Sequence, residues 1–108
     1  MQQHLEGSAE VFVPAIVLGE LHYGANKSAR AAENCARIET FAAKSAVLRC
    51  DAGTARHYGK VKDGLRAKGR PIPENDVWIA ASAIQHNLTL ISRDSHFQEI
   101  DDLRFEPW

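Results

Sequence analysis

Apolar residues are spaced along this chain in two ways: in short consecutive runs, and in longer stretches where they recur every third or fourth position. Short runs bounded by turn residues are typical of strands, and the helical spacing is typical of amphipathic helices. The predicted strands are 10–13, 45–48, 88–91 and an edge strand at 103–105. The predicted helices are 15–24, 28–44, 51–69 and 77–85, followed by at most one turn at 95–98. This alternation predicts an α/β fold with a parallel sheet covered by helices on both faces.

The stretch from Pro71 to Asp94 carries the strongest local signals in the chain. Pro71 and Pro73 fix their own φ and disfavour helix in the residues before them, so we expect a stiff loop. Asn75 or Asp76 is then placed to cap the next helix. In a parallel α/β unit this helix runs antiparallel to the strand that follows it. Asp76, at the helix start, and Asp94, after the strand, should therefore lie at the carboxyl edge of the sheet, where open α/β sheets place their sites.

Glu20 is a third acid that we expect at this edge, since it follows the first strand on the second turn of a helix whose apolar side carries Val17, Leu18, Leu21 and Ala25. Like charges held together stay ionised only with a cation among them. Oxygen ligands without cysteine or a histidine pattern suit Mg²⁺ or Mn²⁺, the ions of phosphodiester chemistry. Each acid also has a plain structural interpretation. Asp76 could simply interact with the helix dipole at a helix start, Asp94 could belong to a turn or a cap, and Glu20 could lie on a solvated helix face. Their common edge favours the metal site.

The bulk composition is that of one ordinary globular domain. The chain has 108 residues, 44% of them hydrophobic and 25% charged, with a formal net charge of −1. That charge implies no attraction of the whole molecule to nucleic acid or membrane. No apolar run approaches the roughly 20 residues of a membrane span. Cys35 and Cys50 lack the spacing of a zinc site, and the five histidines show no ligand spacing either. We expect a cytoplasmic protein.

One basic segment stands apart from this neutral average. Five cations are set against Asp63 alone, and an RNA backbone would fit along them. The alternative is an ordinary solvated helix face, which we would favour without the carboxylates. The proposed RNA-binding residues are Lys60, Lys62, Arg66, Lys68 and Arg70.

Two segments resemble a known family: VPAIVLGELHYGA, and PENDVWIAASAIQHNLTLISRD followed by HF and a last strand ending in Trp. They resemble the PIN-domain ribonuclease toxins of bacterial toxin–antitoxin pairs, the VapC-like proteins. The resemblance implies a three-layer α/β/α fold with a short parallel sheet, Mg²⁺ or Mn²⁺, RNA cleavage, a homodimer, and inhibition by a cognate antitoxin. On the family pattern Glu20, Asp76 and Asp94 match the catalytic, metal-holding acids. Asn75 and Ser92 match polar neighbours that support the site.

One departure from the family pattern concerns the start of the chain. The family opens with a strand ending in an LDT-type segment whose Asp is the first metal ligand, and nothing here matches it; residues 1–7 are typical of a helix end with its glycine stop. We expect residues 1–108 to form a single PIN-like domain, incomplete at its N-terminus. A longer product, a misplaced start codon, or a strand supplied by another chain would each account for this.

Two functions follow from the resemblance. The first is a metal-dependent endoribonuclease toxin, impaired here by loss of the first strand and assembled as a homodimer or strand-swapped oligomer. The alternative is an inactive PIN remnant that serves as an antitoxin- or RNA-binding or dimerisation module.

Overall fold

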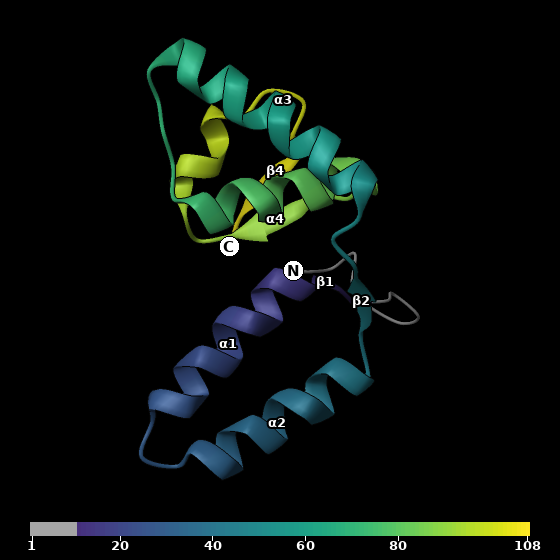
Figure 1. Cartoon of the computed structure of the whole chain (residues 1–108), viewed down its shortest axis with the longest axis vertical. Helices are drawn as coiled ribbons and strands as arrows, with labels where there is room; N and C mark the ends of the chain where they lie inside the picture. Colours follow the sequence, from purple (N-terminus) through teal and green to yellow (C-terminus); the bar gives the residue numbers. More distant parts are fainter. Residues whose placement is uncertain (1–10) are drawn as a thin grey trace. The chain divides into compact units, whose positions relative to one another are not determined.

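The computed structural model describes residues 11–108, which divide into two compact units between Arg49 and Cys50 (Figure 1). The predicted helix end at 1–7 and the predicted strand start at Glu10 lie outside the described residues. The first unit contains β1 (Phe12–Pro14), α1 (Ala15–Lys27), α2 (Ala31–Ala43) and β2 (Ala46–Leu48). The second contains α3 (Ala52–Lys68), α4 (Glu74–Gln85), β3 (Leu90–Ser92), the 3₁₀ helix η2 (Ser95–Glu99) and β4 (Phe105–Pro107).

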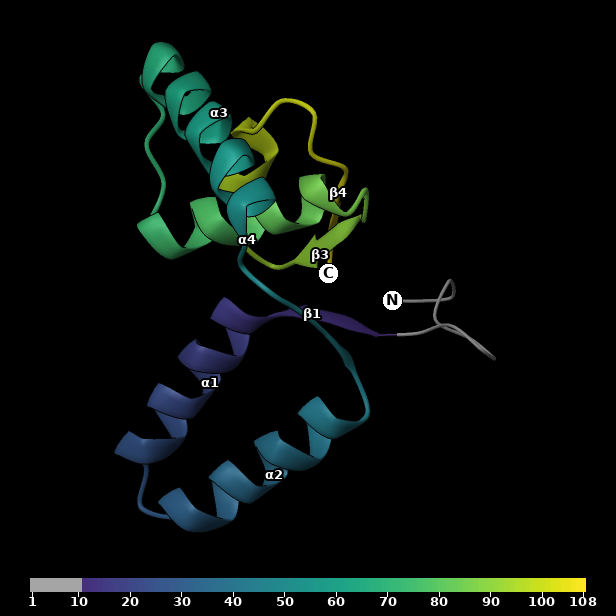
Figure 2. The same ribbon diagram turned by 45° about the vertical axis from the view of Figure 1, so that its right-hand side comes forward.

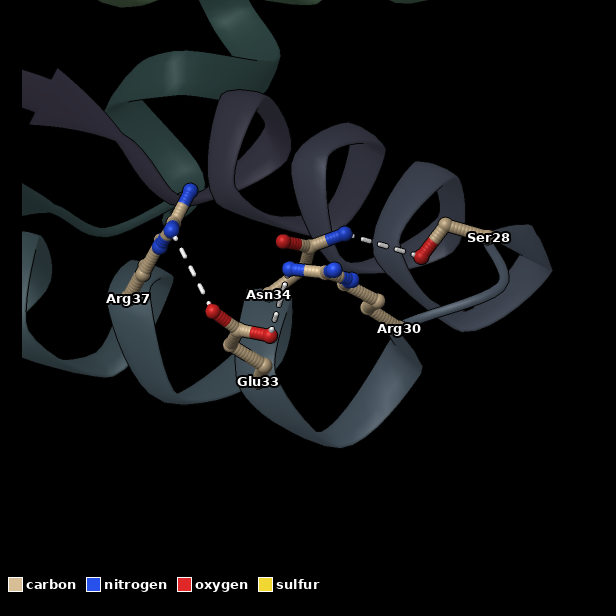
Figure 3. Close-up of polar contacts among 5 residues, drawn as sticks. All are labelled: Ser28, Arg30, Glu33, Asn34 and Arg37. Carbon is tan, nitrogen blue, oxygen red and sulfur yellow. Dashed lines mark hydrogen bonds and ion pairs between the residues drawn. The ribbon is translucent and has the colours of Figure 1, made fainter.

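In the first unit, two helices connect two parallel strands. β1 pairs with β2 in the register Phe12 to Ala46, and α1 packs on α2. Figure 3 shows the polar contacts beside the turn between the helices. The Asn34 amide donates to Ser28 Oγ at 2.9 Å, and the Glu33 carboxylate pairs with guanidinium groups of the same helix and its N-cap.

The predicted apolar side of α1 is only partly buried. Ala25 is buried, but Leu21 is 43% exposed, so the prediction that Leu21 faces a core is wrong in this structure. Phe41 of α2 is exposed too. The helical period of these residues was correct; how much of the stripe becomes covered depends on packing partners that periodicity does not specify.

In the second unit, α3 packs against α4 and the parallel pair β3–β4 lies beside them (Figure 2). The strands pair in the register Leu90 to Phe105, so the predicted strands at 88–91 and 103–105 are each shifted by about two residues along the chain. Asn87, with φ of 57°, occupies the turn between α4 and β3. The core is built mainly of small and branched apolar residues: Val61, Leu65, Val77, Ile79, Ala80, Ala81, Ala83, Phe97 and Ile100.

Asp51 caps the start of α3. The Asp51 side chain accepts a hydrogen bond from the Thr54 backbone N–H at 3.2 Å, and Thr54 Oγ1 accepts one from the Asp51 N–H at 3.0 Å, forming a capping box. Gln85 at the end of α4 also donates to the Asp51 carboxylate, at 2.8 Å. The hydrogen bonds from the Gln85 side chain and the Thr54 backbone lower the pKa of Asp51 to about 2.

The start of α4 differs from the prediction. The helix begins at Glu74 with Pro73 as its N-cap, and neither Asn75 nor Asp76 caps it. The N–H groups of Asp76 and Val77 bond instead to the Pro73 carbonyl, at 3.0 and 3.3 Å. Proline is preorganised for this position because its φ is already close to the helical value. Asp76 is thereby placed inside the first turn, and its carboxylate is not used as a cap.

The α/β class and the parallel strand pairing are confirmed. Residues 11–108 contain four α-helices and two short parallel strand pairs. No helix within this range is long and apolar enough to cross a membrane. The single domain spanning 1–108 stays a prediction.

Candidate metal centre

Asp76, Asp94 and His96 converge in the second unit. One potential ligand atom from each lies within 4.8 Å of those of the other two. His96 Nε2 is 2.7 Å from Asp76 Oδ2. Asp76 and His96 are half-buried and Asp94 is exposed, so solvent reaches the group.

Neighbours in the chain and in the fold position each of these side chains. Asp76 lies in the first turn of α4, where the helix dipole favours a negative charge. β3 ends at Ser92, whose hydroxyl accepts a hydrogen bond from the Asp94 backbone N–H at 3.1 Å. The chain then turns into η2, and Phe97, only 2% exposed, anchors that helix in the core. This anchor brings His96 back towards Asp76.

The plain capping interpretation of Asp94 does not hold. Asp94 is the N-cap residue of η2, but its side chain makes no cap hydrogen bond. Asp76 likewise does not cap α4. Neither carboxylate is therefore used as a cap, and the one partner described for either is His96, which pairs with Asp76 Oδ2.

The donor set of this group fits a hard divalent cation. Two carboxylates held within 4.8 Å repel each other, and a cation between them relieves that repulsion. Carboxylate oxygens suit Mg²⁺ and Mn²⁺, and an imidazole nitrogen is a further ligand for transition metals. The residues present thus fit the ion that the sequence predicted, with Asp76 and Asp94 as its oxygen donors.

The other predicted site residues have different outcomes. Glu20 lies exposed in α1, in the first unit, and the convergence of its carboxylate with Asp76 and Asp94 stays a prediction. Asn75 is exposed in the first turn of α4, next to Asp76. Ser92 contacts the Asp94 backbone rather than its carboxylate.

The basic segment has more acidic partners than the sequence indicated. Lys62 pairs with Glu74 at 3.1 Å, and Lys68 with Asp101 at 2.8 Å. Arg66 pairs with Asp63 at 3.1 Å. Arg70 completes the set, 3.9 Å from Glu99.

Four of the five cations are thus offset locally by acids, three of which come from other elements. Within residues 11–108, Lys60 has no ion-pair partner. Exposed ion pairs are weak and can open, so RNA binding by this segment stays a prediction.

His96 is the residue of this centre that the sequence did not single out. Its spacing from Asp76, twenty positions, matches no ligand motif. Two signals were present in the sequence: His96 belongs to the HF segment of the family resemblance, and it lies two residues after Asp94 in a predicted turn. Although the histidines show no ligand spacing in the sequence, the fold places His96 in a group that could hold a metal ion.

The sequence of this chain is similar to those of known proteins. The family described as "PIN domain" matches residues 2–103. The chain is 36% identical to the "Ribonuclease VapC2" of Haemophilus influenzae over 104 residues, which cover 95% of this chain and 79% of that protein. It is 35% identical to the "tRNA(fMet)-specific endonuclease VapC" of Shigella flexneri over 97 residues, covering 89% of this chain and 74% of that protein.

Solved structures agree with the sequence comparison. The crystal structure of VapBC2 from Rickettsia felis, bound to a promoter DNA fragment, matches with a TM-score of 0.90 and 31% identity, covering 98% of this chain and 80% of that one. DNA-bound VapBC from Salmonella typhimurium also has a TM-score of 0.90 and 31% identity, covering 98% of this chain and 81% of that one.

Proposed function

Because this chain belongs to the PIN-domain family and is VapC-like within it, we propose that it is a divalent-metal-dependent endoribonuclease, the toxin of a toxin–antitoxin pair. The resemblance seen in the sequence is confirmed. The relatives are named ribonucleases and a tRNA(fMet)-specific endonuclease, which supports RNA as the substrate class.

The observation that carries the proposal is the convergence of Asp76, Asp94 and His96. Asp76 and Asp94 would hold Mg²⁺ or Mn²⁺, and Glu20 would add a carboxylate directly or through water. The bound ion would supply positive charge that stabilises the negative charge developing on the phosphodiester.

The chain's own residues then have distinct tasks. The His96 hydrogen bond fixes the rotamer of Asp76, and Ser92 fixes the backbone that carries Asp94. Asp94, being exposed, faces the solvent from which both RNA and the attacking water arrive. Attack on phosphorus breaks the P–O3′ bond and leaves a 5′-phosphate, the outcome that the family resemblance implies.

The proposal includes partners. The similar structures are VapBC assemblies, which supports a cognate antitoxin as the inhibitor of this chain. The proposal also includes a homodimer and a cytoplasmic location. Asn75, the residue before Asp76, would act as a polar supporting residue of the site.

The test is a cleavage assay on a transcribed tRNA(fMet) and on an unrelated structured RNA. The purified protein is incubated with Mn²⁺, Mg²⁺ or chelator, and the product ends are mapped. We expect metal-dependent cleavage whose rate falls to background in Asp94→Asn. In Glu20→Gln the rate should fall at least about a hundredfold, as it does on loss of a group that stabilises the transition state. Asp63→Asn, an exposed acid on α3, is the matched control and should stay active.

Two results would contradict the proposal. Cleavage that survives chelation, or full activity in Asp94→Asn, would remove the metal centre from the reaction. A protein that binds its antitoxin but cleaves no RNA under any metal would favour the alternative, an inactive PIN module that acts by binding alone.

A further inference from the structure

Trp108 is the most exposed large apolar residue among those described, at 79% of its surface. Its backbone N–H donates to the Ser92 carbonyl at 3.0 Å. The guanidinium carbon of Arg93 lies 5.2 Å from the centre of the Trp108 ring. A large indole is thus held beside the strand end that leads directly into Asp94.

The parallel register explains this placement. β3 and β4 run in the same direction, with Ser92 opposite Pro107. The residues that follow the two strands, Arg93 and Trp108, therefore leave the sheet side by side at its carboxyl edge. In Figure 2 the end of the chain accordingly lies beside β3. Asp94 is the next residue after Arg93, so the ring sits at the same edge as the metal centre.

A core function does not account for an indole in this position. Burial is what makes a tryptophan stabilising, and this ring keeps most of its surface in water. The cation–π contact with Arg93 is worth only about 0.5–1 kcal/mol at an exposed site. What the arrangement does provide is a flat aromatic face in solvent, backed by a cation, at the strand end that leads into Asp94.

We propose that Trp108, backed by Arg93, is a stacking platform for an unpaired RNA base adjacent to the bond cleaved at the Asp76–Asp94 centre. This inference rests on the proposed function and identifies an unpaired base of the RNA substrate as a group that the protein binds. Aromatic rings bind any base by its π-face, and proteins use such platforms on single strands and loops. Arg93 keeps the indole in place from one side and adds positive charge where a phosphate passes.

The test measures RNA affinity without cleavage, in chelator, with a fluorescein-labelled single-stranded oligoribonucleotide followed by anisotropy. Removing the ring on which one base stacks should weaken binding about 5- to 150-fold, so we expect a loss in this range for Trp108→Ala. Trp108→Phe keeps a ring and should recover most of the affinity. Tyr23→Ala is the matched control, because Tyr23 is also exposed and has Lys27 4.6 Å above its ring, but lies on α1.

Salt dependence separates stacking from charge. Trp108→Ala should leave the slope of log affinity against log salt unchanged, because stacking releases no counterion. Arg93→Gln should reduce that slope by about 0.7, the value for one phosphate on a single strand. Thermal melting of both variants shows whether the fold is kept.

Fluorescence gives a direct readout of the ring. The chain has two tryptophans, and Trp78→Phe leaves Trp108 as the only one while keeping a ring against Tyr58. RNA should then quench the remaining emission in chelator, where no cleavage occurs. An unquenched signal, or equal affinity of Trp108→Ala and the parent protein, overturns the platform even if cleavage is metal-dependent as proposed. Loss of metal-dependent cleavage with intact quenching would count against the proposed function instead.

Discussion

Asp76→Asn is the sharpest test of the metal centre, because the amide has nearly the size of the carboxylate and removes only its charge. Asp76 does not cap α4, since Pro73 occupies the cap position without a side-chain bond. The exchange therefore breaks no cap. An amide can still pair with His96, which is 2.7 Å away.

The structure allows the effect on metal-free stability to be bounded. The carboxylates of Asp76 and Asp94 lie at most 4.8 Å apart, where repulsion is about 1 kcal/mol in a water-like medium and about 3.5 kcal/mol at an effective dielectric of about 20. Asp94 is exposed, so the lower value applies. Losing a negative charge at a helix start costs about 0.3–1 kcal/mol. These opposite effects nearly cancel, and we expect a change within about 1 kcal/mol.

The effect on metal binding is much larger. An ion at one hundred times its dissociation constant stabilises the folded protein by about 2.7 kcal/mol. For a chain of this size that corresponds to a rise in Tm of about 10 °C. Asp76→Asn removes one of the two charged ligands described in the second unit, so most of this rise should disappear.

The assay is thermal melting of the parent protein and the variant in chelator and across a Mn²⁺ titration. Asp63→Asn, which removes an exposed carboxylate from α3, is the control and should keep the full metal shift. The reasoning is refuted if Asp76→Asn shows the same Mn²⁺ shift as the parent protein. A fall of more than about 2 kcal/mol in chelator would show instead that Asp76 has a structural function.

Two further predictions concern charge elsewhere in the second unit. Lys60→Gln should weaken RNA binding and reduce the slope of log affinity against log salt by about 0.7. Arg66→Gln should change the affinity and the slope less, because Asp63 already offsets the charge of Arg66. If both variants bind RNA as tightly as the parent protein, the segment is only a solvated face. Asp51, whose pKa is lowered from 3.8 to about 2, favours the folded state above about pH 4, and this contribution is lost as the pH falls towards 2. The stability difference between the parent protein and Asp51→Ala, from urea unfolding at each pH, should therefore shrink over that window, and a constant difference would contradict it.

The sequence by itself determined most of the elements and the approach of Asp76 to Asp94. Helical and strand periods depend on residues close in the chain, as does the capping box of Asp51 and Thr54, and the structure contains the helices that these periods predict. Asp76 and Asp94 belong to one helix and the strand that follows it. Their convergence therefore follows from the direction of two consecutive elements, and the sequence was enough to predict it.

Tertiary structure alone decided which groups meet across longer separations. Pairing of His96 with Asp76 requires the buried ring of Phe97 to anchor η2. The ion pair of Lys68 with Asp101 spans 33 positions, and it is one of four ion pairs that offset most of the positive charge of the basic segment. Such contacts depend on how the core packs rather than on local spacing, and that packing is a property of the whole unit. Periodicity marks which side chains are apolar, but only the packed fold determines which polar groups are brought together.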